Sequence, residues 1–170
     1  MTLETLKDVY VDQLQDLYSA DRQAVEVTQE LAELARHEDL KAALKRGVAG
    51  IAEGRDTLAN LIRGHGAAPT GEFCKGMEGL AREARAHAIE ADFADDDVRD
   101  AVIISQYQRM AHYAIAGYGC CAAFARRLGL NAEAGQMQDC LDKTYHGDSE
   151  MSRLAIGEVN PDAIAARPSS

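Results

Sequence analysis

Apolar side chains recur at alternating spacings of three and four residues along the first part of the chain. The series begins at Leu6 and ends at Leu34. This spacing is typical of one face of an α-helix, because about 3.6 residues complete each turn. We predict a first long helix that Thr2 caps at its start and that ends near Arg36 and His37.

A second apolar series runs from Leu40 to Ile62 and predicts a second long helix. The glycines on either side of His65 and the proline at position 69 indicate that this helix ends at Gly64. The same signals predict a short helix over residues 77–84 in the connection that follows. Two further long helices are expected over residues 98–128 and 131–157.

The order of these elements indicates the fold. No alternating run of β-branched residues carries a hairpin turn, so no strand is predicted. Two helices, a long crossover with a short helix, and two more helices are the arrangement of a ferritin-like four-helix bundle. We therefore predict an all-α bundle over residues 1–157. Residues 158–170 contain two of the three prolines and are expected to form a flexible C-terminal tail.

Composition and charge exclude several classes of function. The chain has 28 acidic and 18 basic residues and a net charge of −10. Nucleic acids and anionic membranes both bind basic surfaces, so we expect neither as a partner. The first residues lack the pattern of a signal peptide, and no apolar run is long enough to span a bilayer. We expect a cytoplasmic protein whose four cysteines are reduced and packed as small apolar side chains.

Three long helices each place one possible metal ligand on or near the apolar face. Asp21 lies in the first helix, His112 in the third and Asp148 in the fourth, each close to the middle of its helix. A buried carboxylate without a partner is costly, so each aspartate needs a cation, a metal ion or hydrogen bonds. These residues are the candidate metal ligands.

The second helix lacks the side chains that a pair of metal ions requires. At the matching height it carries Gly47, Gly50 and Gly54, and its inward charged candidate is Arg55. Di-iron bundles use a Glu from each of two helices and a Glu-x-x-His motif from each of the other two, and no such motif occurs here. We therefore predict that the protein does not hold a stable pair of iron atoms.

Two interpretations of these polar residues remain open at this point. Asp21, His112 and Asp148 could hold a single iron or zinc ion, with water completing its coordination. Alternatively, Asp21, Arg55, His112 and Asp148 form a buried polar cluster without metal. Gln108 and Tyr118 would then complete its hydrogen bonds.

Three motifs carry a resemblance to a known family. They are LYSADRQ at residues 17–23, CKGMEGL at residues 74–80 and QRMAHYAIAGYG at residues 108–119. In this order, the motifs resemble those of the YciE/YciF family of ferritin-like bacterial stress proteins, over about residues 3–157. The resemblance implies a cytoplasmic bundle, usually dimeric, with a suspected metal centre and no assigned reaction.

The chain also departs from that family. The family often has Glu at position 21, carboxylates in place of the glycines of the second helix, and Glu at the positions of Ala111 and Ala114. Only Asp21, His112 and Asp148 can be carried over as ligands from the resemblance. A single iron or zinc ion is the cofactor that this set would allow.

Two functions are compared on this basis. The first is a dimeric stress-response protein with a degenerate or absent di-metal centre, which acts by assembly or protection. The alternative is a metal-dependent oxidoreductase or peroxide-detoxifying enzyme of the rubrerythrin kind. The missing ligands favour the first. A homodimer is expected because residues 114–124 of the third helix are apolar on more than one face.

Overall fold

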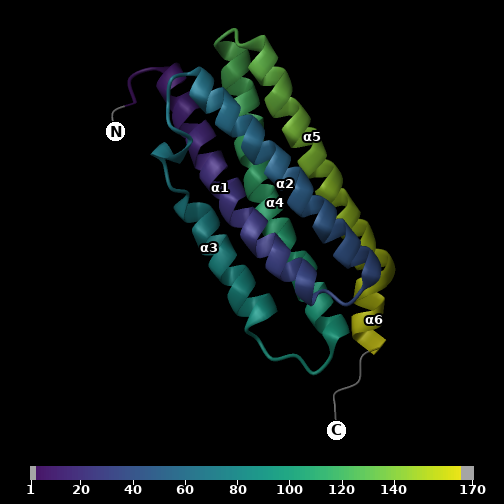
Figure 1. Cartoon of the computed structure of the whole chain (residues 1–170). Helices are drawn as coiled ribbons and strands as arrows, with labels where there is room; N and C mark the ends of the chain where they lie inside the picture. Colours follow the sequence, from purple (N-terminus) through teal and green to yellow (C-terminus); the bar gives the residue numbers. More distant parts are fainter. Residues whose placement is uncertain (1–2, 166–170) are drawn as a thin grey trace.

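The computed structural model describes residues 3–165, which form long helices and no strand. Figure 1 shows the helices in chain order. Their bounds are α1 Leu6–Leu34, α2 Glu38–Gly64, α3 Lys75–Ala84, α4 Asp96–Arg127, α5 Asn131–Leu154 and α6 Asn160–Ala165. Short helical turns lie at Pro69–Gly71, Arg85–Ile89 and Ala155–Val159. The predicted all-α bundle, with a short helix in the long crossover, is confirmed.

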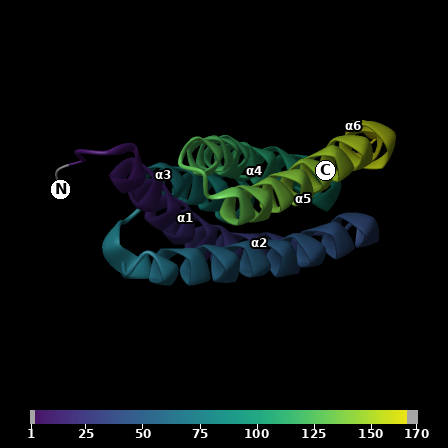
Figure 2. The ribbon, with the colours of Figure 1, turned by 90° about the horizontal axis from the view of Figure 1, so that it is seen from above.

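The four long helices form two hairpins that pack against each other. α1 packs mainly against α2, and α4 mainly against α5, as Figure 2 shows from above. α3 lies against α1 and α4. Among residues 3–165, no helix combines the length and apolar character needed to cross a bilayer.

The N-cap of the first helix lies three residues beyond the predicted one, and it forms a capping box. The Thr5 hydroxyl accepts a hydrogen bond from the Asp8 amide at 3.1 Å, and the Asp8 carboxylate accepts one from the Thr5 amide at 2.8 Å. The reciprocal pair satisfies two backbone donors at the helix start. Thr5 is therefore the cap. Thr2 lies outside the described residues.

The connection between α1 and α2 is held by a residue from α4. The Asp100 side chain is buried and accepts hydrogen bonds from the backbone amides of Arg36 and His37, at 3.1 and 2.7 Å. A buried carboxylate is stabilised by such donors, and the turn between the helices gains two partners for its amides. Asp100 thus fixes the α1–α2 hairpin onto the second hairpin.

The C-terminal segment differs from the prediction. Residues 158–165 are helical, Val159 is buried, and α6 contacts α4. Pro161 is the second residue of α6 and follows the π-helical turn Ala155–Val159 without a break, so its missing amide removes one backbone donor there. The predicted flexible tail is therefore wrong for residues 158–165. Residues 166–170 lie outside the described part of the chain.

Packing is looser on one side of the bundle. The side between α2 and α5 has the least extensive contact of the four. On α2 no residue between Leu44 and Gly54 is fully buried, and on α5 none between Met137 and Met151. The two helices therefore stand apart along their middle thirds.

Candidate functional site

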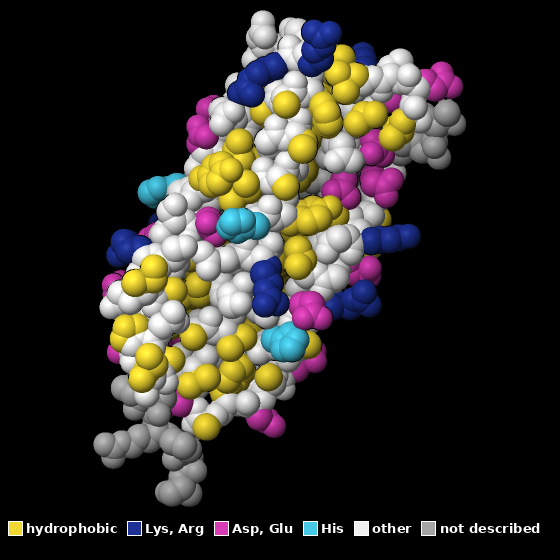
Figure 3. Space-filling model, turned by 180° about the vertical axis from the view of Figure 1, so that it is seen from behind, with side chains coloured by type: hydrophobic (Ala, Val, Ile, Leu, Met, Phe, Trp, Pro, Cys, Tyr) yellow, Lys and Arg dark blue, Asp and Glu magenta, His cyan; other side chains and the backbone are white. Residues whose placement is uncertain are grey.

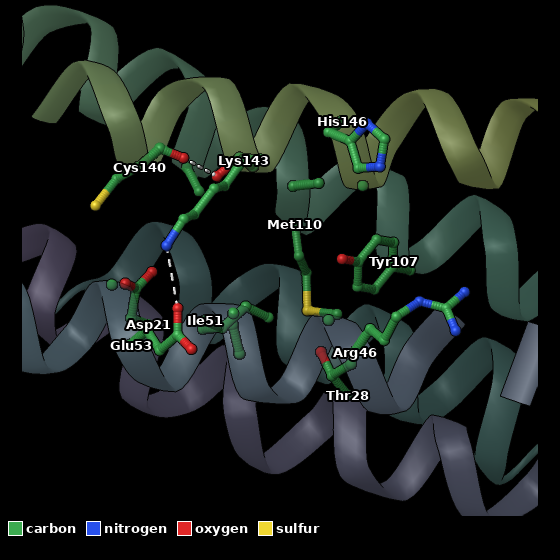
Figure 4. A pocket seen from close by; sticks show the side chains of 18 of the residues that line it. Asp21, Thr28, Arg46, Ile51, Glu53, Tyr107, Met110, Cys140, Lys143 and His146 are labelled. Carbon is green, nitrogen blue, oxygen red and sulfur yellow. Dashed lines mark hydrogen bonds and ion pairs between the residues drawn. The ribbon is translucent and has the colours of Figure 1, made fainter. Parts of the chain in front are cut away.

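A cavity of about 490 Å³ opens between α2 and α5 and reaches α1 and α4. Figure 4 shows residues from these helices around the cavity. Most of its wall is apolar and includes Ile51, Met77, Met110 and Met151. The volume lies within the range of about 300–1,000 Å³ that is usual for small-molecule sites.

Glycines on α2 create this space. A Cβ atom at Gly50 would meet no neighbour within 4 Å, so this position borders open volume. A Cβ at Gly54 would lie 2.5 Å from the Tyr118 hydroxyl and 3.2 Å from Asp21 Oδ2. Gly54 therefore lets an α1 side chain and an α4 side chain meet directly beneath α2.

Asp21 is the carboxylate in the floor of the cavity. It is 2% exposed and accepts a hydrogen bond of 2.5 Å from the Tyr118 hydroxyl. Burial raises the pKa of Asp21 to about 7, although the Tyr118 hydrogen bond and the charge of Arg55 both lower it. Near neutral pH this carboxyl can gain or lose a proton, and its ionised form favours a cation.

Two neutral hydroxyl groups accompany Asp21. The Thr28 side chain is fully buried on the same wall, and its hydroxyl has no hydrogen-bond partner. The Tyr107 hydroxyl lies between Gly47 and Gly147, at 2.8 and 3.5 Å from where their Cβ atoms would be. Burial raises the pKa of Tyr107 to about 12, so this group stays protonated. The buried floor of the cavity thus offers one carboxyl and uncharged hydroxyls beside apolar side chains. The other charged residues of the lining, which include Glu53, Asp142 and Glu150, are exposed or partly exposed.

Two ion pairs join α2 to α5 at the mouth of the cavity. Arg46 lies 2.6 Å from Glu150, and Lys143 lies 3.1 Å from Glu53. Figure 4 shows Lys143 reaching across to Glu53. Both pairs include exposed side chains, for which such contacts contribute about 0–1 kcal/mol. The mouth is therefore bridged by weak contacts that can open.

His112 and Asp148 lie away from this cavity. The side chain of His112 is 63% exposed, and its Nε2 lies 3.1 Å from the Asp148 carboxylate. Gln108 donates hydrogen bonds to Asp148 Oδ1 at 3.0 Å and to the Ser152 hydroxyl at 2.8 Å. These residues link α4 to α5, and the prediction that His112 points inward is wrong.

Arg55 is also placed differently from the prediction. Its guanidinium binds the carboxylate of the neighbouring Asp56, and its side chain is 31% exposed. It acts on Asp21 through its charge alone. The predicted single cluster is therefore two separate groups. Asp21 and Tyr118 lie in the core, and Gln108, His112 and Asp148 lie between α4 and α5.

The sequence alone does not reveal Thr28 and Tyr107 as polar groups of the site. Both lie on helical faces that are otherwise apolar, which is the usual pattern of core residues. One signal was available. The three glycines of α2 share a face, and glycine in a helix interior is unfavourable unless space or close approach requires it.

The comparisons with known proteins define the family. The family model described as "Domain of unknown function (DUF892)" matches residues 5–164. The chain belongs to this family. The DUF892 chain is 30% identical over 164 residues to protein YciF of Escherichia coli strain K12, across 96% of this chain and 98% of that protein.

Solved structures resemble the DUF892 chain closely. The crystal structure of the E. coli stress protein YciF matches with a TM-score of 0.86 and 30% identity, over 93% of this chain and 99% of that one. YcfI from Rhodopseudomonas palustris matches with a TM-score of 0.81 and 28% identity, over 88% and 94% of the two chains. A Xanthomonas campestris protein, XCC3681, shares the fold with a TM-score of 0.72 at 15% identity and 95% coverage of both chains.

The donor set of the DUF892 chain does not fit a di-metal centre. Within residues 3–165, no three His, Cys, Asp or Glu side chains lie close enough together to hold a metal ion. Asp21 is the only carboxylate in the buried floor, and α2 presents glycines opposite it. Two metal ions in a bundle need several carboxylates that bridge them and offset their charge. The buried floor of the cavity offers apolar side chains and a single carboxyl instead.

Proposed function

We propose that this chain is a cytoplasmic stress-response protein that acts by protection and assembly, as a homodimer, and that it is not a di-iron enzyme. Its similarity to YciF, which is described as a stress protein, supports the stress-related role. It does not share the chemistry of a rubrerythrin-like oxidoreductase, because such chemistry requires metal ligands that do not come together among residues 3–165.

The observation that carries this proposal is the isolation of Asp21. Its direct polar partner is the Tyr118 hydroxyl. Gly50 and Gly54 stand on α2 where side-chain ligands would be needed, and His112 and Asp148 face away from the cavity. A bundle interior built in this way favours an assembly role or a binding role over redox chemistry.

Iron loading tests the proposal. Ferrous iron is added anaerobically to protein purified without a chelator or an affinity tag, and the sample is desalted. We expect far less than one iron per chain and no oxygen consumption above that of free iron. Two irons per chain that survive desalting, or rapid oxygen uptake, would contradict the proposal.

The outer face of α4 supports the dimer. Ala116, Cys120 and Ala123 are exposed there, one helical turn apart, and they present small apolar side chains. Figure 3 shows the molecule from behind, where hydrophobic side chains recur along its length among acidic, basic and histidine side chains. Small residues let two helices approach closely, so a second copy of α4 fits this face.

A further inference from the structure

Two buried polar groups of the α2–α5 cavity lie in a line along α1. Asp21 and Thr28 both line the cavity and are seven residues apart, so they share one face of the helix. Their separation along the axis is about 10 Å, from a rise of about 1.5 Å per residue. Between and around them the wall is apolar, with Ala24 on α1 and Met77, Met110 and Met151 from the other helices.

Among the described residues, Asp21 lacks a cationic partner and Thr28 lacks a hydrogen-bond partner. No ion pair in the described structure joins Asp21 to a cation, because Arg55 binds Asp56 and Lys143 binds Glu53. The Thr28 hydroxyl is fully buried without any hydrogen-bond partner. In Figure 4 the Thr28 hydroxyl points away from α1 toward the helices that enclose the cavity. Unpaired buried polar groups are uncommon and indicate a missing partner.

We propose that this cavity binds a linear amphiphilic amine, with its ammonium group on Asp21, its apolar chain along α1 and a hydroxyl group at its far end on Thr28. The carboxylate favours a cation over a neutral or anionic head group. The apolar surroundings of Thr28 favour an uncharged second group. The methionines are suited to a flexible chain, because their side chains adapt to irregular shapes.

The choice of an amine over a fatty acid follows from charge. A carboxylate ligand would meet Asp21 as a like charge in a buried site. The cations of the lining, Arg46 and Lys143, already pair with Glu150 and Glu53 at the mouth. An ammonium ligand removes the cost of burying Asp21 alone, because each charge supplies the partner that the other needs. Entry requires only that the weak Arg46–Glu150 and Lys143–Glu53 contacts at the mouth separate.

Binding of the amine should depend on pH. The groups around Asp21 are Arg55 and Glu53 on α2, Tyr118 on α4, and Cys140 and Lys143 on α5. Among them, Asp21 is the group with a pKa near neutrality, at about 7. A proton on Asp21 competes with the ammonium group, so affinity should fall by about tenfold per pH unit once the pH is well below 7. His146 lies at the mouth, and H146Q is the control for its contribution to binding.

The probes are four eight-carbon compounds: 8-amino-1-octanol, n-octylamine, 1-octanol and octanoate. Titration calorimetry gives their affinities for the full chain. Carbon-13 NMR of the methionine methyl groups reports where they bind. We expect the amino alcohol to bind most tightly and octanoate not to bind. The signals of Met77, Met110 and Met151 should shift, whereas that of Met137, which is buried outside the cavity, should not.

Two variants test the contact with Asp21 and the contact with Thr28 independently. D21N should weaken both amines by at least about tenfold and leave 1-octanol unchanged, because the charge is lost and the shape is kept. T28V should abolish the preference for 8-amino-1-octanol over n-octylamine while leaving n-octylamine affinity unchanged. Equal binding of the amines to D21N and to the natural chain would overturn the proposal.

A variant that fills the cavity tests whether the compounds bind there. G50L introduces a side chain into open volume at the cavity and should abolish binding. Gly135 is an exposed glycine on α5 that also has no neighbour within 4 Å of an added Cβ, so G135L is a matched control that should bind normally. Undiminished binding to G50L, or equal shifts of all methionine signals, would show nonspecific association and overturn the proposal. These readouts are independent of iron content, so they fail or succeed separately from the proposed function.

Discussion

Asp21 and Thr28 are buried on the same face of α1, and each makes the folded protein less stable than an apolar residue would. Asp21 has a pKa of about 7 in the folded protein against an ordinary value of 3.8, because its charged form is removed from water. Its burial follows directly from the apolar stripe of the first helix. Tyr118 was among the residues expected to complete the hydrogen bonds of the polar cluster, and it does bind Asp21. That it pairs with Asp21 apart from His112 and Asp148 could not be predicted, because this depends on how the helices are rotated against one another.

The raised pKa of Asp21 predicts a pH-dependent stability. The folded state holds the proton more tightly than the unfolded state, so Asp21 imposes no penalty below about pH 4. The penalty grows as the pH rises through the window up to about 7 and is then constant. The two pKa values differ by about three units, which corresponds to about 4 kcal/mol in unfolding free energy.

The variant D21N tests this dependence. Asn does not titrate, so the fall in unfolding free energy between about pH 4 and pH 7 should be much smaller in D21N than in the natural chain. Urea unfolding followed by circular dichroism at several pH values measures it. Parallel curves for the two proteins across this window would show that Asp21 titrates normally.

The unpaired hydroxyl of Thr28 predicts that an apolar substitution at this position will stabilise the folded protein. Its hydroxyl has no partner, so T28V removes an unsatisfied group at nearly constant shape and should raise the unfolding free energy by about 1 kcal/mol. Thr144 is the matched control, because its hydroxyl donates to the Cys140 carbonyl at 2.8 Å. T144V should give no such gain. A loss of stability in T28V would mean that its hydroxyl is satisfied in the free protein.

At the scale of the elements, α4 explains why the site was only partly predictable. The helix is apolar almost all round, so periodicity alone does not fix which face is inward. The buried stripe contains the large residues Ile103, Tyr107, Met110 and Tyr118. Weighting the positions by side-chain size would have put His112 outside. The helix bounds were predictable because Gly66 and Gly129, with φ of +76° and +75°, terminate α2 and α4.

For α5 the prediction of the inward face failed for a different reason. Its inner positions between Met137 and Met151 face the cavity or the groove against α4, so their side chains are only partly buried. The stripe that runs through Asp148 is continuous in the sequence, but it does not correspond to a continuous packed face. A cavity leaves no periodic pattern of apolar residues, and the glycines of α2 are the feature of the sequence that indicates it.

Two glycines of α2 should respond in opposite ways to the same substitution. G50A adds a methyl group to open space and improves helix propensity, so it should stabilise the protein by about 1 kcal/mol. G54A brings a methyl group against the Tyr118 hydroxyl and Asp21, so it should destabilise by about 1–3 kcal/mol. Thermal unfolding of both variants measures the difference. Similar effects from the two would contradict the close approach at Gly54.

At the scale of the whole molecule, the exposed small residues of α4 predict a symmetric dimer. Light scattering at micromolar concentration should give the mass of two 18.4 kDa chains. A116E places a charge in the centre of the proposed interface and should yield a monomer. A49E, at an exposed alanine of α2, is the matched control and should stay dimeric. A monomeric natural chain, or a dimer that persists in A116E, would exclude this interface.

The central claim is that the floor of the α2–α5 cavity holds one buried, titratable carboxyl, Asp21, and no metal pair. Carbon-13 NMR of the Asp21 side chain, titrated with and without excess zinc, tests this claim most directly. D21N identifies the signal. We predict a midpoint near pH 7 that zinc leaves unchanged, because no other ligand group lies close enough to complete a site. A midpoint near the ordinary value of 3.8, or a titration that disappears when zinc is added, would contradict it.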